Sequence, residues 1–196
     1  MKKLLVILFV VLVSITAFLI AQNNNRVPKG WHFGAMDTSL YETGIDNSTF
    51  ESGHSSVYIK SNNTDTKEFG NIMQAINAEN YLGKRLRLTG YIKSKNVTGS
   101  CQMWMRIDGQ SRGESLAFDN MQNRQIKGTT VWKQYSIVLD VPANSRIINY
   151  GALIVGTGKM WIDNFKIEEV NKSVPVTDIS KINTLPSSPV NLDFEE

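Results

Sequence analysis

Three side chains that could hold a polar ligand share one face of a predicted strand at residues 101–108. The segment alternates apolar and polar residues, which is typical of a strand with one buried face. It places Trp104, Arg106 and Asp108 on the same side. Flat rings stack on an indole, while a guanidinium and a carboxylate supply orienting hydrogen bonds. We expect this row to be a ligand surface. The alternative is a surface ion pair beside a tryptophan that packs under a loop.

Asp119 and Asn120 are further candidates for ligand contact, at the end of the expected return strand over residues 114–119. Short polar side chains at such a point also commonly accept hydrogen bonds from backbone amides in the following turn. Both interpretations, ligand contact and turn formation, remain open from the sequence.

Residues suited to catalysis are scarce. The chain has two histidines and one cysteine, and it lacks HExxH and Gly-x-Ser-x-Gly motifs. Asp108 with Asp119 or Glu114 could form a glycosidase pair, which needs carboxylates about 5–10 Å apart. Any sandwich exposes such pairs by chance, so we expect a non-catalytic protein without a cofactor. Cys101 falls on the apolar face of its strand, which predicts a buried small hydrophobe.

Composition fits a globular domain. Hydrophobic residues make up 41% and charged residues 20%, which argues against wholesale disorder. The formal net charge is +3, and without Lys2 and Lys3 the remainder is close to neutral. This balance and the lack of a basic stripe argue against a nucleic-acid partner.

Short strands at near-regular spacing account for most of the chain. We expect them at residues 31–36, 54–60, 70–78, 84–95, 101–108, 114–119, 132–141, 147–155 and 159–170. Residues 38–47 form a loop or a short strand, residues 122–130 a loop, and the last two strands a hairpin. The pattern predicts an all-β fold, an antiparallel two-sheet β-sandwich of the jelly-roll type, preceded by one N-terminal hydrophobic helix.

We expect the N-terminal segment at residues 1–21 to be a membrane anchor or a signal segment. Its apolar run of eighteen residues would form a helix about 27 Å long, close to a hydrocarbon core of roughly 30 Å. We favour an uncleaved anchor, because the run is long and lacks a small-x-small cleavage site. A polar spacer follows at 22–29, the sandwich at 30–170, and a linker-like tail at 171–196. The protein is then anchored facing outside the cytoplasm, or secreted if the segment is cleaved.

A set of aromatic, glycine and polar motifs extends over the predicted sandwich. They are Trp31, Gly83-Lys84, Trp104-Met105-Arg106, Phe118-Asp119-Asn120-Met121, Gly128-Thr129, Trp132 and the segment from Gly156 to Trp161. With them the chain resembles the galactose-binding and carbohydrate-binding jelly-roll families. In particular, it is similar to an uncharacterised bacterial module found beside C-terminal-processing peptidases and some regulators. The resemblance implies a binding or accessory role without catalytic residues.

The tail resembles the opening strand of such modules at residues 191–195, either a truncated second module or a strand of the same sandwich. The resemblance also implies a structural calcium near Asp163 and Glu195. Our first hypothesis is a module that binds a glycan or another polar cell-surface ligand and is attached to the membrane by its N-terminal segment. The alternatives are a protein–protein accessory domain of an envelope protease or regulatory system, with a cell-surface protein as partner, and a carbohydrate-active enzyme.

Overall fold

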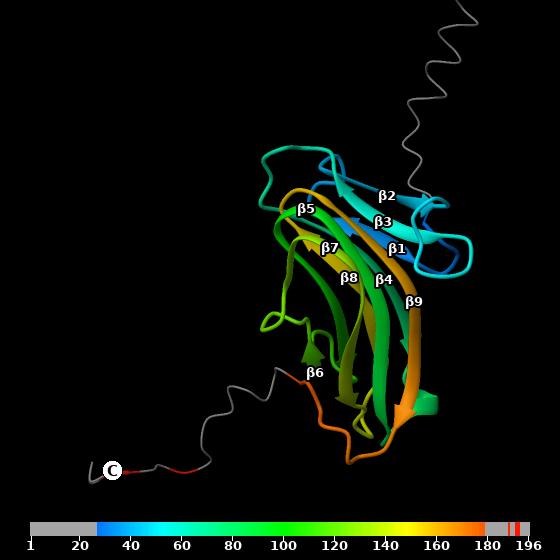
Figure 1. Ribbon diagram of the computed structural model, residues 1–196. Coiled ribbons are helices and arrows are strands. Elements are labelled where there is room, and N and C mark those ends of the chain that lie inside the picture. Colours follow the sequence, from blue (N-terminus) through cyan, green and yellow to red (C-terminus); the bar gives the residue numbers. More distant parts are fainter. Residues whose placement is uncertain (1–26, 179–187, 189–190, 193–196) are drawn as a thin grey trace, which may run out of the picture.

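Nine β-strands and one short 3-10 helix form the protein in the computed structural model, which describes residues 27–178, 188 and 191–192 (Figure 1). The elements are β1 (His32–Ala35), β2 (Tyr41–Asp46), β3 (Ser56–Ser61), β4 (Phe69–Asn77), η1 (Glu79–Tyr81), β5 (Arg85–Asp108), β6 (Ser115–Asp119), β7 (Ile126–Asp140), β8 (Ile147–Val155) and β9 (Lys159–Val170). All strand pairs are antiparallel. The predicted all-β sandwich is confirmed.

The long strand β5 belongs to both sheets. Its first half pairs with β7 and β9, and its second half pairs with β8 and β6. The first sheet therefore runs β2-β3-β9-β5-β7 and the second β1-β4-β8-β5-β6. We expected two separate strands here. The chain instead bends through repeated register shifts between Ile92 and Cys101, where Asn96 adopts a φ of 55°.

The core lies between the sheets and follows the predicted alternation along β5. The inward residues of both halves are fully buried: Leu86, Leu88, Ile92, Cys101, Met103, Met105 and Ile107. Burial raises the pKa of the Cys101 thiol to about 12, so this side chain is protonated at neutral pH. Its predicted role as a buried small hydrophobe is confirmed.

The expected hairpin between the last two strands is wrong. β8 lies between β4 and β5 in the second sheet, whereas β9 lies between β5 and β3 in the first. The turn at residues 156–158 therefore crosses from one sheet to the other. A short Gly-rich turn can connect two strands of one hairpin or two strands of different sheets. Which of the two forms here depends on the distant strands with which β8 and β9 pair.

Strand β7 begins earlier than expected, within the polar segment that we interpreted as a loop. Ile126 pairs with Cys101 and is buried, and Gly128 pairs with Val97. The register there is irregular, since it follows the bend of β5. Polar composition concealed this strand because the side chains of residues 127–136 are all exposed or half-buried.

The first residues of the tail are hydrogen-bonded to the sandwich. The Thr177 amide donates to the Val138 carbonyl at 2.8 Å, and the Thr177 hydroxyl accepts from the Val138 amide at 2.9 Å. The Asp178 carboxylate accepts from the Phe118 amide at 3.2 Å. Residues 171–178 therefore extend along β7 and reach β6.

The predicted N-terminal helix at residues 1–21, most of the spacer at 22–29 and Glu195 lie outside the described residues. Of the predicted strand at 191–195, only Asn191 and Leu192 are described, and neither is in a strand. Within the part of the chain that the structure describes, no helix has the length and apolarity to span a membrane.

Candidate ligand-binding site

Trp104 has the predicted orientation but not the predicted accessibility. It faces away from the core, and only 9% of its surface is exposed. In register it lies opposite Gly151 of β8, which has no side chain to stop the indole from crossing that strand. The Trp104 indole N–H donates to Oδ1 of Asn71 on β4 at 2.8 Å. The ring is therefore fixed against the second sheet and offers little area for stacking.

Arg106 and Asp108 form a closed pair. The guanidinium donates to both carboxylate oxygens, at 2.7 and 2.8 Å, and Asn149 adds a third hydrogen bond to Asp108 at 2.7 Å. The side chains are 47% and 19% exposed. The structure thus brings the three predicted residues to one face and gives each a partner within the protein. Their contact with a ligand stays a prediction.

Asp119 and Asn120 form the turn that follows β6. Asp119 is fully buried, and its carboxylate accepts from the Met121 amide at 2.7 Å and from Arg124 at 2.5 and 3.2 Å. The Asn120 side chain accepts from the Gln122 amide at 3.1 Å. These contacts are those of the turn-forming alternative, and Asp119 has no exposed surface for a ligand.

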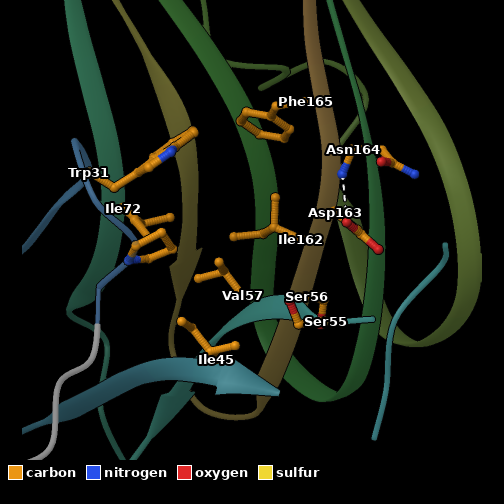
Figure 2. Close-up of a pocket in the computed structure, with 11 residues that line it drawn as sticks. Trp31, Ile45, Ser55, Ser56, Val57, Ile72, Ile162, Asp163, Asn164 and Phe165 are labelled. Carbon is orange, nitrogen blue, oxygen red and sulfur yellow. Dashed lines mark hydrogen bonds between the residues drawn. The ribbon is translucent and has the colours of Figure 1, made fainter. Parts of the chain in front are cut away.

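A pocket of about 210 Å³ lies between the two sheets, and of the predicted site residues only Asp163, the expected calcium ligand, is in its lining (Figure 2). The second sheet contributes Ile72, and the first contributes Ile45, Val57, Ile162 and Phe165. The remaining lining residues are Pro28, Trp31, Ser55, Ser56, Asp163 and Asn164. In Figure 2 the apolar side chains converge from both sheets, while Asp163 and Asn164 lie on the other side of β9.

Trp31 is the main aromatic surface of this pocket. It lies just before β1, edge-on to Tyr150 with ring centroids 5.7 Å apart, and 5.6 Å from Phe165. The Gln74 amide donates to the Gly30 carbonyl at 3.0 Å and accepts from the Tyr150 hydroxyl. Gly30 has a φ of 84°, which favours glycine. These contacts hold the tryptophan at the mouth of the sandwich.

An irregularity in β9 produces the rest of the pocket. The register with β5 shifts opposite Gly90, and Asn164 has a φ of 52°. The extra residue reverses the alternation, so Ile162 and Phe165 both face inward. A Cβ on Gly90 would lie 2.2 Å from the Phe165 ring, so the glycine makes room for it.

Asp163 and Asn164 form hydrogen bonds with the loop that contains Glu51 and Ser52. The Asp163 carboxylate accepts from the amides of Glu51, Ser52 and Asn164, at 2.8, 3.2 and 2.8 Å. The Asn164 amide donates to Glu51 and Ser52 at 2.8 and 2.6 Å. Hydrogen bonds within the protein therefore connect the two parts of the margin.

The calcium expectation concerns Asp163 and Glu195. The hydrogen bonds from three backbone amides already engage Asp163, and Glu195 is not among the described residues. In the described ranges, no group of three or more His, Cys, Asp or Glu side chains could hold a metal ion. The calcium site stays a prediction.

We compared the chain with protein-family models, with curated proteins and with solved structures. No protein-family model matches the chain. The chain is 45% identical over 169 residues to the uncharacterized HTH-type transcriptional regulator YbfP of Bacillus subtilis (strain 168). The match covers 86% of this chain, which spans 57% of that protein's length.

Two solved structures share the architecture. One is the enzymatically active domain of bacteriophage CBA120 tailspike protein 4, with a TM-score of 0.54 and 17% identity over 76% of this chain and 20% of that one. The other is a xylan-binding domain from carbohydrate-binding module family 22, with a TM-score of 0.51 and 13% identity over 74% and 89%. This chain therefore has the β-sandwich fold of carbohydrate-binding modules.

Proposed function

We propose that this chain is a non-catalytic module that binds a glycan outside the cytoplasm, with the pocket beside Trp31 as its binding site. One observation carries the proposal. Between the sheets, Trp31 and Phe165 border a pocket whose floor is aliphatic and whose margin is polar. An aromatic surface with a few polar groups is the usual composition of a small-ligand site.

The size of the pocket suits one sugar unit. At about 210 Å³ it falls below the roughly 300–1,000 Å³ of sites for drug-sized ligands. A pyranose could place its C–H face against the Trp31 ring and direct its hydroxyls toward Ser55 and the solvent. The fold shared with a xylan-binding domain supports a carbohydrate as the ligand class. The lysines and apolar run at the N-terminus support export.

A second candidate is a protein–protein accessory domain that binds no small ligand and contacts a protein of an envelope protease or regulatory system. The similarity to a protein named as a transcriptional regulator favours it. As part of this second candidate, we propose that the chain is related to the bacterial module found beside C-terminal-processing peptidases and some regulators. Retention of a protein partner without retention of any glycan would favour the second candidate over the first.

The test is retention on immobilised polysaccharides, xylan among them, for the wild type and two pocket variants. Trp31→Ala removes the stacking surface, and Ser55→Tyr fills the mouth from an exposed position without removing a core contact. We expect both to weaken retention by about tenfold. Trp132→Ala is the matched control, since that indole does not line the pocket. Unchanged retention of every bound glycan by both pocket variants would contradict the proposal.

A further inference from the structure

Three lysines stand side by side on the outer face of the first sheet. Lys60 of β3 lies opposite Lys159 of β9, and Lys159 lies opposite Lys95 of β5. Directly opposed side chains on antiparallel strands have Cβ atoms about 4.5–5.5 Å apart, and like charges there destabilise the sheet. Without partners for its charges, the row would therefore weaken the first sheet.

Carboxylates neutralise only part of the row. Lys60 pairs with Glu42 at 3.0 Å, and Lys159 pairs with Asp46 at 3.2 Å. Lys95 is exposed, and across residues 27–178 the structure gives it neither a carboxylate nor another hydrogen-bond acceptor. The ammonium group of Lys95 is therefore the part of the row that an external anion can reach without displacing a carboxylate.

Lys159 is held in place rather than mobile. Its Nζ lies 4.1 Å from the centroid of the Tyr58 ring and 4.5 Å from that of Trp161. The Trp161 indole also donates to Asp46 at 2.8 Å. A cation between two aromatic rings loses less conformational entropy when an anion binds, because its position is already defined.

The row borders a groove of about 420 Å³ at one end of the sandwich, which we call the lysine groove. Its lining residues are Lys60, Ser61, Asn62, Asn63, Thr64, Lys95, Asn96, Thr157, Gly158 and Lys159. They carry ammonium, amide and hydroxyl groups, and they include no carboxylate and no aromatic ring. Such a lining suits a ligand with both negative charge and many hydroxyls.

Hydrogen bonds connect the segments that line the lysine groove. The Ser61 amide donates to the Gly158 carbonyl at 2.9 Å, and the Gly158 amide donates to the Ser61 hydroxyl at 3.0 Å. The Thr157 amide donates to the Thr98 hydroxyl at 3.0 Å. Gly158 has a φ of 119°, and a Cβ there would lie 2.7 Å from the Asn96 carbonyl oxygen. Contacts within the protein therefore define the shape of the groove.

We propose that the lysine groove binds the carboxylates of an acidic polysaccharide. The choice of polymer rests on the proposed glycan-binding function, but the groove shares no residue with the Trp31 pocket. Nucleic acid fits less well, because single strands bind through bases stacked on aromatic rings and this lining has none. An anion beside Lys95 would also offset the one charge of the row that Glu42 and Asp46 do not pair.

The test compares polygalacturonate with its fully methyl-esterified form, which has the same backbone without the charge. We expect the wild type to bind polygalacturonate with an affinity that falls as salt rises, and to bind the ester at least about tenfold more weakly. Lys95→Gln should weaken binding of the acidic polymer about tenfold. Lys84→Gln, at the far end of the first sheet and paired with Glu169, is the matched control and should bind as the wild type does.

Lys95→Glu separates binding from folding. It places a negative charge opposite Lys159, so we expect its unfolding midpoint to rise while polygalacturonate binding is lost. The inference is overturned if the wild type does not bind, if the ester binds equally well, or if Lys84→Gln loses as much affinity as Lys95→Gln. Equal, Lys95-dependent binding of single-stranded DNA would also overturn it. If Trp31→Ala and Ser55→Tyr leave retention of every glycan unchanged while Lys95 dependence persists, the pocket proposal fails and the groove stands.

Discussion

The indole nitrogen of Trp104 lies 2.8 Å from Oδ1 of Asn71, although β8 separates the strands that carry them. An exposed tryptophan on a strand could stack on a sugar ring. This hydrogen bond instead connects Trp104 on β5 to β4 across β8. The most conspicuous aromatic of the sequence is thus engaged in the fold, whereas the half-buried Trp31 borders the pocket.

Trp104→Phe should lower the free energy of unfolding by about 1–3 kcal/mol, because it deletes the hydrogen bond to Asn71 and leaves part of the space of the nearly buried indole unfilled. Chemical denaturation measures this loss. Binding of any retained glycan should be unchanged. Normal stability together with lost binding would return Trp104 to the ligand surface.

Gly90→Ala should destabilise the protein by about 1–3 kcal/mol, because the added methyl group meets the Phe165 ring. Gly34→Ala is the control, since a Cβ at Gly34 has no heavy-atom neighbour within 4 Å. Urea unfolding of both variants measures the difference. Equal stabilities would contradict the placement of Phe165 over Gly90.

Arg124→Gln should cost about 2 kcal/mol of unfolding free energy, because it removes the charged partner of the fully buried Asp119. Arg106→Gln removes the same charge from a half-exposed pair with Asp108 and should cost less than about 1 kcal/mol. Denaturation curves of the two variants rank the pairs. The reverse ranking would mean that Arg106–Asp108 is the structural pair.

Stability should fall in acid partly through Asp46. Burial opposes ionisation of this carboxyl, but hydrogen bonds from Ser48, Trp161 and Lys159 together outweigh it and hold its pKa well below the usual 3.8. A carboxyl with a lowered pKa stabilises the fold above its unfolded-state pKa, and the contribution is lost as pH falls below that value. Urea midpoints between pH 6 and about pH 3 should therefore decline less in Asp46→Asn than in the wild type. Parallel declines would show that Asp46 carries no such contribution.

Alternation along the chain was sufficient to predict the β-sandwich and the inward residues of β5, because burial follows the period of a strand. Alternation could not predict which side chains cover the outward face of β5. Whether Trp104 is open or covered depends on Gly151 opposite it and on Asn71 two strands away, and neither is near it in sequence. Likewise, the turn at residues 156–158 satisfies a hairpin locally, but β8 and β9 pair with distant strands.

The pocket escaped prediction for a related reason. Trp31, Ile72 and Phe165 come from separate elements, and only the packing of the sheets brings them together. One signal was nevertheless present in the sequence. Apolar residues alternate at 160 and 162 and again at 165 and 167, but Asp163 and Asn164 together separate the two pairs. One extra residue between two alternating runs indicates a β-bulge, after which Phe165 still faces inward.

The most direct test of the central claim is an NMR titration that follows the indole N–H signals of the four tryptophans with a glycan that the protein retains. We predict that the Trp31 signal shifts in a saturable way, while Trp104 and Trp161, whose indoles are hydrogen-bonded within the protein, stay in place. A saturable shift of Trp104 with an unmoved Trp31 would contradict the account.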